Sequence, residues 1–518
     1  MTGRATTAPP RTRAATRRWA VPAWLTRLAA LDFTRPLPAA VLALLYLLSR
    51  MPWLTLSYGT DPDAARVAIT AHWFWEYGEY YTSRLPGYPI FEFVQIALYP
   101  LGATVMNSAT LLISFAGVLL FAALLKRLAV EPKGLLTLTY VFVPMVWINS
   151  SITLDYLWGL TFIFGAYLTL LGPAATDDAP RSATRRIGPL SLNPGPLLAG
   201  VLLGVATGCR PTSAMMVLPL LVLLVHQRRW RAIPQFLIGM GLVALIAFLP
   251  LFLQYGTSFL NFFDVRPTWK RFARTLGVEA FGLSSAVGLL VVAALSWRQL
   301  LQLPRRLRLD IHLAVCVLAV LLVMMSFMRL PLEESYLTPA IPFLLIGAAR
   351  LLRRRALVAV CLLLVMGSVV DFHTESKEGW RRPLSAIAGI RPEPGRVLID
   401  RELRQHRLHV VAGLREAGLP APAVITAGFY YPIFVAEYAD ELTLSLPHGF
   451  ERDQIGPLTD HSEARDARGV AYVWLMRPGD ARRYRVEGYR TFTMDLDGSD
   501  VLHTFETYLP EHERFAVR

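Results

Sequence analysis

Two carboxylates and an arginine stand close together where the first long apolar segment of the chain ends. Asp61 and Asp63 follow that segment, and Arg66 comes one helical turn after Asp63. A carboxylate beside a membrane loses part of its water, which makes it a stronger base. Either aspartate could therefore take a proton from an acceptor hydroxyl or amine, and Arg66 could steady a phosphate. The plainer alternative is that the aspartates cap the following helix and that Arg66 forms an i,i+3 ion pair with Asp63.

An arginine suited to binding phosphate follows in a turn rich in proline and glycine. Arg84 lies within Ser83–Pro89, directly after a segment crowded with tryptophan and tyrosine. Its guanidinium group can offer a phosphate two parallel hydrogen bonds, although such a side chain can also reach out to lipid headgroups. Because aromatic residues favour the membrane interface, we expect a helix from about Pro62 to Tyr77 that lies flat on the bilayer.

Further polar residues mark the ends of later apolar segments. Asp155, Arg210 and Glu334 each stand at such an end, and Tyr336 follows Glu334 closely. Ionisable groups at membrane depth are costly, so they usually have a function. We expect these ends to lie on the same side of the membrane as Asp63, around one polar cavity that opens outward.

The segments that must hold these residues are long and apolar. Of the 518 residues, 54% are hydrophobic, and the mean hydropathy is +0.41. A helix needs about 20 apolar residues to cross a bilayer, where it satisfies its own backbone groups. We therefore predict an all-α polytopic membrane protein with about eleven transmembrane helices. These cover Leu37–Tyr58, Thr104–Leu125, Leu135–Ile148, Thr153–Leu171, Pro196–Gly208, Pro211–Val225, Ala232–Leu253, Gly277–Trp297, Ile311–Met328, Tyr336–Ala349 and Ala356–Val370.

The net charge of +14 is interpreted as a sign of membrane topology, and no nucleic-acid partner is expected. Basic clusters fall in alternate loops between the predicted helices, for example at Lys126–Arg127 and Arg298–Arg308. The positive-inside rule makes these loops cytoplasmic. We therefore expect a multi-pass protein of the plasma (inner) membrane, with its N-terminus inside and Asp63 outside.

Composition divides the chain into three parts. Residues 1–35 are predicted to be a disordered, basic cytoplasmic tail. Residues 36–371 are predicted to form the transmembrane domain, with an outer loop at residues 58–103. Residues 372–518 are predicted to form an extracytoplasmic α/β domain.

The last part carries the patterns of a small mixed domain. We expect strands at Ala423–Ala427 and Val470–Met476, and a helix at Arg401–Ala417. The three cysteines of the chain lie in or beside apolar segments, which excludes a disulfide framework for this domain. It holds no catalytic motif that we recognise, which favours an acceptor-binding or interaction module.

Five short motifs occur in the order, and on the predicted membrane side, of one known family. They are Pro62–Ala68, Ser83–Pro89, Leu154–Tyr156, Gly208–Pro211 and Tyr336–Pro342. The first is similar to that family's Pro-Asp-Glu-x-Arg-x-Ala pattern, except that Ala64 stands where Glu is usual. In these motifs the chain resembles the membrane glycosyltransferases of the GT-C fold, particularly the bacterial branch related to protein O-mannosyltransferases and to the aminoarabinose transferase of lipid A.

The resemblance implies transfer of a sugar from a polyprenyl-phosphate donor, with inversion, to a glycan, lipid or protein acceptor. It implies that Asp63 is the catalytic base, and the departure at Ala64 leaves open whether Asp61 shares that role. No cofactor is required, although Asp61 and Asp63 together could hold a divalent cation.

The resemblance also implies roles for the cations. Arg84 would contact the donor phosphate, Arg210 and Arg66 would assist, and Asp155 would position them. Two residues at the mouth of the tenth predicted helix, Glu334 and Tyr336, would support the site.

Two other functions fit parts of the pattern. A transporter or flippase of lipid-linked glycans would carry polar residues along whole helices, whereas the ionisable residues here gather at the predicted outer ends. A non-catalytic membrane assembly protein would tolerate replacement of Asp63 and Arg84.

Overall fold

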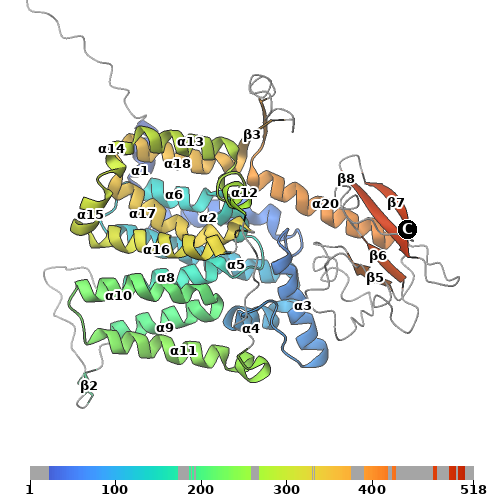
Figure 1. Ribbon diagram of the computed structural model, residues 1–518, viewed down its shortest axis with the longest axis horizontal. Coiled ribbons are helices and arrows are strands. Elements are labelled where there is room, and N and C mark those ends of the chain that lie inside the picture. Colours follow the sequence, from blue (N-terminus) through green and yellow to red (C-terminus); the bar gives the residue numbers. More distant parts are fainter. Residues whose placement is uncertain are drawn as a thin grey trace, which may run out of the picture.

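A bundle of apolar helices carries a smaller, mixed segment at one end (Figure 1). The computed structural model describes residues 23–172, 186–187, 190–191, 194–257, 268–329, 331, 333–374, 390–417, 423–426, 471–474, 489–496 and 500–507. Among these residues, four helices are long and apolar enough to cross a membrane, or five if the bent pair Trp269–Glu279 and Leu283–Leu295 is one span. Their length and composition make the chain a multi-pass membrane protein.

The elements before residue 172 build the first part of the bundle and the helices α3 and α4 at one end of it. They are α1 (Ala23–Ala29), α2 (Pro36–Leu54), α3 (Pro62–Tyr77), α4 (Pro89–Leu98), η1 (Tyr99–Leu101), α5 (Ala103–Arg127), α6 (Lys133–Phe142), α7 (Pro144–Asn149) and α8 (Tyr156–Leu171). The helix expected over Pro62–Tyr77 is confirmed as α3.

The later elements complete the bundle. They are β1 (Arg186–Ile187), β2 (Leu190–Ser191), α9 (Pro194–Cys209), η2 (Pro211–Met216), α10 (Val217–His226), α11 (Ala232–Tyr255), α12 (Trp269–Arg274), η4 (Thr275–Glu279), α13 (Leu283–Leu295), α14 (Trp297–Leu300), α15 (Leu303–Leu309), α16 (Ile311–Arg329), η5 (Glu334–Ala340), α17 (Ile341–Leu351) and α18 (Arg354–Val369).

Each of the predicted apolar segments contains a helix, but some are broken. The segment Leu135–Ile148 is divided between α6 and α7, because Pro144 has no N–H to continue the helical hydrogen bonds. The segment Gly277–Trp297 is bent by 95° before α13, at Gly282, whose φ of +84° suits glycine. The number of helices that cross the membrane therefore stays a prediction.

The helix surfaces differ between the rim and the centre of the bundle. On α11, Leu245, Ile246 and Leu253 are exposed, and such a surface is suited to lipid. At the centre, Phe121 and Phe164 are buried and their rings pack at 5.6 Å. The apolar side chains thus serve two purposes, facing lipid outside and filling the core inside.

The prediction of a disordered tail over residues 1–35 is wrong for its last part. Residues 23–29 form α1, which packs on α6, and Ala29 and Phe33 are buried in the core. The apolar side chains of this stretch find a surface on the bundle, which composition alone did not reveal. Residues 1–22 lie outside the described residues.

The segment after α18 mixes strands with one long helix. β3 (Val370–Thr374) pairs antiparallel with β4 (Ile390–Pro394), and α20 (Arg396–Ala417) follows, beginning five residues before the predicted helix. β5 (Ala423–Thr426) pairs parallel with β6 (Ala471–Trp474), at the two predicted strands. β7 (Tyr489–Leu496) and β8 (Asp500–Thr507) form an antiparallel pair. The predicted domain boundaries at 372–518 and its side of the membrane stay predictions.

Two helices of the bundle approach closely through glycine. A Cβ atom on Gly239 of α11 would lie 2.5 Å from the carbonyl oxygen of Leu197 on α9. A Cβ atom on Gly200 of α9 would lie 2.0 Å from the carbonyl oxygen of Phe236. Small residues let helix backbones meet in this way in membranes.

We predict that Gly239→Ala destabilises the bundle, because the new methyl group must push α9 and α11 apart. Overpacking of this kind costs about 1–3 kcal/mol. Thermal unfolding of the purified protein in detergent measures the effect. Gly241→Ala on the same helix is the matched control, since no atom beyond the adjacent helix backbone lies within 4 Å of its Cβ position. Equal melting temperatures for the two variants would contradict the close packing.

Candidate active site

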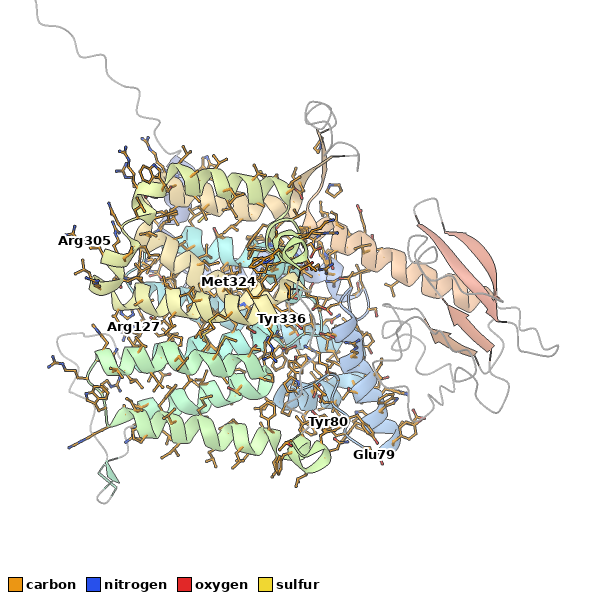
Figure 2. The ribbon with its side chains drawn as sticks, viewed as in Figure 1. Glu79, Tyr80, Arg127, Arg305, Met324 and Tyr336 are labelled. Atoms are coloured by element: carbon orange, nitrogen blue, oxygen red, sulfur yellow. The ribbon has the colours of Figure 1, made fainter. Side chains whose placement is uncertain are left out.

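The candidate site lies at the end of the bundle where α3 runs across the long helices (Figure 1). The side chain of Asp61 caps α3 by accepting a hydrogen bond from the backbone N–H of Asp63 at 2.9 Å. Figure 2 shows Tyr336 toward this end of the bundle, with Arg127 and Arg305 at the other end. The basic clusters around these two arginines, at the end of α5 and in α15, therefore lie away from the site.

Ion pairs link five charged side chains into one chain. Asp63 Oδ1 accepts from Arg66 Nη1 at 2.8 Å, and Asp63 Oδ2 lies 3.0 Å from Arg84 Nε. Arg84 Nη2 in turn donates to Asp155 Oδ1. Arg210 Nη1 donates to Asp155 Oδ2 at 2.5 Å. Apart from the half-buried Arg66, all are buried, and Asp155 is 0% exposed.

Aromatic rings cover the two buried arginines. The Arg84 guanidinium lies 3.9 Å from the ring centre of Tyr88, and that of Arg210 lies 3.7 Å from Tyr156 and 5.2 Å from Tyr336. A cation over a ring face is attracted by the ring's electrons, the more so away from water. The rings therefore hold both guanidinium groups without neutralising them.

The ion-pair chain has one surplus positive charge. Three guanidinium groups face two carboxylates, so three minus two leaves one. Arg84 Nη1 is buried and has no hydrogen-bond partner among the described residues. A buried charged donor without a partner is costly, and a phosphate oxygen is a strong acceptor for it. The arrangement thus favours an anion at Arg84.

A buried glutamate that the sequence analysis did not single out shapes the turn before α4. Glu92 Oε1 accepts from the backbone N–H of Ser83 at 2.8 Å and from the Ser83 hydroxyl. Its other oxygen accepts from the Tyr80 hydroxyl. Glu92 thereby fixes the residue next to Arg84. The signal that could have found it is the single acid of the mostly apolar helix α4.

Two further acids lie close to Asp63. One carboxylate oxygen from each of Asp61, Asp63 and Glu333 lies within 4.8 Å of the others. Loss of water contact raises the pKa of Asp61 to about 7, and the charge of Asp63 adds to the shift. Loss of water contact also raises the pKa of Glu333 well above its usual range. Three such oxygens could also hold a divalent cation.

A cavity of about 300 Å³ opens beside these acids. Asp61, Glu333 and Glu334 line one part of it, and α20 lines another. Glu334 pairs with Arg396 of α20 at 2.9 Å. Glu334 is therefore a residue of this cavity rather than a partner of the buried arginines.

The structure brings together most of the residues that the sequence singled out. Asp63, Arg84, Asp155 and Arg210 meet in one network, with Arg66 and Tyr336 at its edges. The plainer alternatives also hold in part, because Asp61 is a helix cap and Arg66 forms the i,i+3 pair. The sequence analysis did not single out three residues that the site uses: Tyr88, Glu92 and Tyr156.

We predict that Asp155→Ala destabilises the protein severely. The substitution leaves Arg84 and Arg210 buried side by side without their shared carboxylate, which costs about 3–5 kcal/mol. Thermal unfolding in detergent checks this. Glu76→Ala is the control, because Glu76 is half exposed and its 2.7 Å pair with His72 is worth less than about 1 kcal/mol. Similar losses in both variants would contradict the central role of Asp155.

Comparisons with known proteins bear on the fold. No protein-family model and no curated protein matches the chain. Among solved structures, the chain is similar to the crystal structure of ArnT from Cupriavidus metallidurans bound to undecaprenyl phosphate. The two share 14% identity at a TM-score of 0.51, over 91% of this chain and 98% of that one. The apo state of that protein matches with 14% identity at a TM-score of 0.47, over 90% and 98%.

A likeness at this identity speaks for the fold. ArnT is a lipid A aminoarabinose transferase of the GT-C fold, which is the fold that the five sequence motifs implied. The chain therefore has a fold like that of the GT-C membrane glycosyltransferases.

Proposed function

We propose that this protein transfers a sugar from a polyprenyl-phosphate donor to an acceptor on the outer face of the plasma membrane. The observation that carries the proposal is the buried ion-pair chain from Asp63 through Arg84 and Asp155 to Arg210, at the end of an apolar bundle. It offers a base and a phosphate site side by side, and a fold shared with a structure that binds undecaprenyl phosphate supports the donor class.

The donor would bind with its phosphate on the arginines. Arg84 Nη1 would donate to a phosphate oxygen, and Arg210 would add positive charge. The polyprenyl tail would lie in the bilayer, against the helix ends and against α3 and α4. These helices carry exposed Trp75, Tyr77 and Phe93, side chains that suit the membrane interface.

The reaction would be a single displacement. The acceptor oxygen attacks the anomeric carbon on the face opposite the phosphate, while Asp63 takes the hydroxyl proton. The bond from that carbon to the phosphate oxygen breaks, and the electron pair leaves with polyprenyl phosphate. Arg84 and Arg210 stabilise the charge that develops there. Backside attack inverts the anomeric centre.

These steps do not require a metal, because the arginines would supply positive charge at the leaving group. Asp155 positions the arginines, Tyr336 covers Arg210, and Glu334 supports the acceptor side through Arg396. The basic loops would face the cytoplasm, which places the N-terminus inside.

We predict that Asp63→Asn lowers the transfer rate by about 10²–10⁴-fold, because the amide cannot accept the proton. Arg84→Ala should lower it by about 10²–10³-fold by removing a donor to the leaving phosphate. The assay uses purified protein, a panel of polyprenyl-phosphate monosaccharides and a membrane extract that supplies acceptors. It follows the release of free polyprenyl phosphate.

Glu76→Gln on α3 is the matched control and should keep wild-type activity. Melting temperatures confirm that each variant is folded. If the wild type releases no polyprenyl phosphate from any donor, the transferase proposal fails, and transport of lipid-linked glycans becomes the favoured function. If both variants keep full activity, the site is not catalytic. Loss of activity on chelation, with recovery by Mg²⁺, would place a cation at the three carboxylates.

The pKa of Asp61, raised to about 7 by loss of water contact, predicts a modest pH dependence. Asp61 is mostly protonated below pH 7 and ionised above it. The ionised form lies beside Asp63 and strengthens it as a base, so the transfer rate should rise about two- to threefold through pH 7. Asp61→Asn, which retains helix-capping ability, should remove this rise. A tenfold change per pH unit below pH 7 would instead identify Asp61 as the base.

A further inference from the structure

The cavity beside Asp63 has a defined chemical character. Its volume of about 300 Å³ is at the lower end of small-molecule sites, which span roughly 300–1,000 Å³. Thr60 and Asn149 give it neutral polar walls, and Ile152, Ile399 and Leu403 give it apolar ones. Such walls suit a compact group that has both hydroxyls and C–H faces.

Asp63 lies next to both the arginine network and the acids of the cavity. Its Oδ2 lies 3.0 Å from Arg84 Nε, and its carboxylate lies within 4.8 Å of oxygens of Asp61 and Glu333. Five acids line the cavity, Asp61, Glu279, Glu333, Glu334 and Asp400, against two arginines, Arg271 and Arg396. Because the acids outnumber the arginines there, a phosphate binds more favourably at Arg84.

The acids of the cavity are not all neutralised by arginine. Asp400 pairs with Arg404 at 2.7 Å, and Glu334 pairs with Arg396. No ion pair joins Asp61 or Glu333 to a basic side chain among the described residues. Glu333 Oε2 is buried and lacks a hydrogen-bond partner there. These oxygens can accept hydrogen bonds from a ligand.

Helix α20 is fixed against this cavity by buried contacts. Arg404 is fully buried, with 1% of the residue exposed. Its Nη2 donates to Ser151 Oγ at 3.2 Å. The Thr60 hydroxyl donates to Asp400 Oδ1 at 2.5 Å. The C-terminal segment thus supplies one wall of the cavity through α20.

We propose that this cavity binds the acceptor, and that the acceptor is a saccharide without a negative charge near its reacting hydroxyl. The sugar hydroxyls would donate to Asp61 and Glu333, and the apolar walls would cover its C–H faces. The reacting hydroxyl would then face Asp63, opposite the donor phosphate. The inference rests on the proposed transferase function and adds the class of acceptor.

The first test compares acceptors at a saturating donor concentration. The probes are neutral methyl disaccharides of hexoses and pentoses, the same disaccharides carrying a phosphate or a carboxylate, and a peptide containing serine and threonine. We expect kcat/KM to be at least about tenfold higher for the neutral saccharides, because the acids repel the anionic forms. Equal or preferred use of the anionic saccharides or of the peptide would overturn the inference.

The second test alters the cavity itself. Leu403→Trp should fill part of it and raise the KM for the neutral disaccharide severalfold, whereas Gln405→Trp, at an exposed position of the same helix, should not. Glu333→Leu should also raise the KM for the neutral disaccharide severalfold, because it removes the oxygens that would bind the sugar hydroxyls. An unchanged acceptor KM in Leu403→Trp or in Glu333→Leu would overturn the assignment.

Binding of undecaprenyl phosphate separates this inference from the proposed function. Titration of the wild type and Leu403→Trp should give equal affinities, because Leu403 lines the cavity and neither Arg84 nor Arg210 does. A wild type that binds no undecaprenyl phosphate and uses no donor removes the proposed function, and the acceptor assignment with it. A wild type that binds the lipid and uses a donor, but prefers anionic acceptors, overturns the acceptor assignment alone.

Discussion

Asp155 sets the constraint on which the site depends. Two guanidinium groups inside an apolar bundle have lost much of their water and repel each other, and one carboxylate gives each of them an oxygen. Asp155 stands directly before α8, Arg84 lies in the turn before α4, and Arg210 lies between α9 and η2. One fully buried residue therefore ties three elements together, and Asp63 joins the arrangement through Arg84.

The irregular ends of the helices make this meeting possible. Apart from Arg66, which lies one turn inside α3, each charged residue of the network stands at the start of a helix or in a break, where the backbone leaves the regular bundle. A break such as Cys209–Arg210–Pro211 turns the arginine inward, and the ring of Tyr156 then covers it. The apolar middle of the bundle supplies rigidity, while the chemistry gathers at its end.

The sequence predicted the helices of the bundle and most of the charged network. A long apolar run satisfies its backbone hydrogen bonds in a membrane by forming a helix. A charged residue at the end of such a run is rare and therefore stands out in the sequence. The sequence could not show that Asp155 bridges two arginines, because that contact joins residues far apart in the chain. It gave no role to Tyr88 and Tyr156, although both lie in the motifs, since tyrosines beside a membrane are common and their faces matter only through what packs on them.

The ion pairs of Asp63 explain how this carboxylate could respond to donor binding and also accept a proton from the acceptor in the proposed reaction. Arg66 and Arg84 contact its two oxygens, so it is fully engaged before any ligand binds. A phosphate on Arg84 would compete for the same guanidinium and weaken its hold on Asp63 Oδ2. The base would then be most available when the donor is in place and an acceptor hydroxyl lies beside the acids of the cavity. In the proposed reaction, donor binding would therefore precede proton transfer.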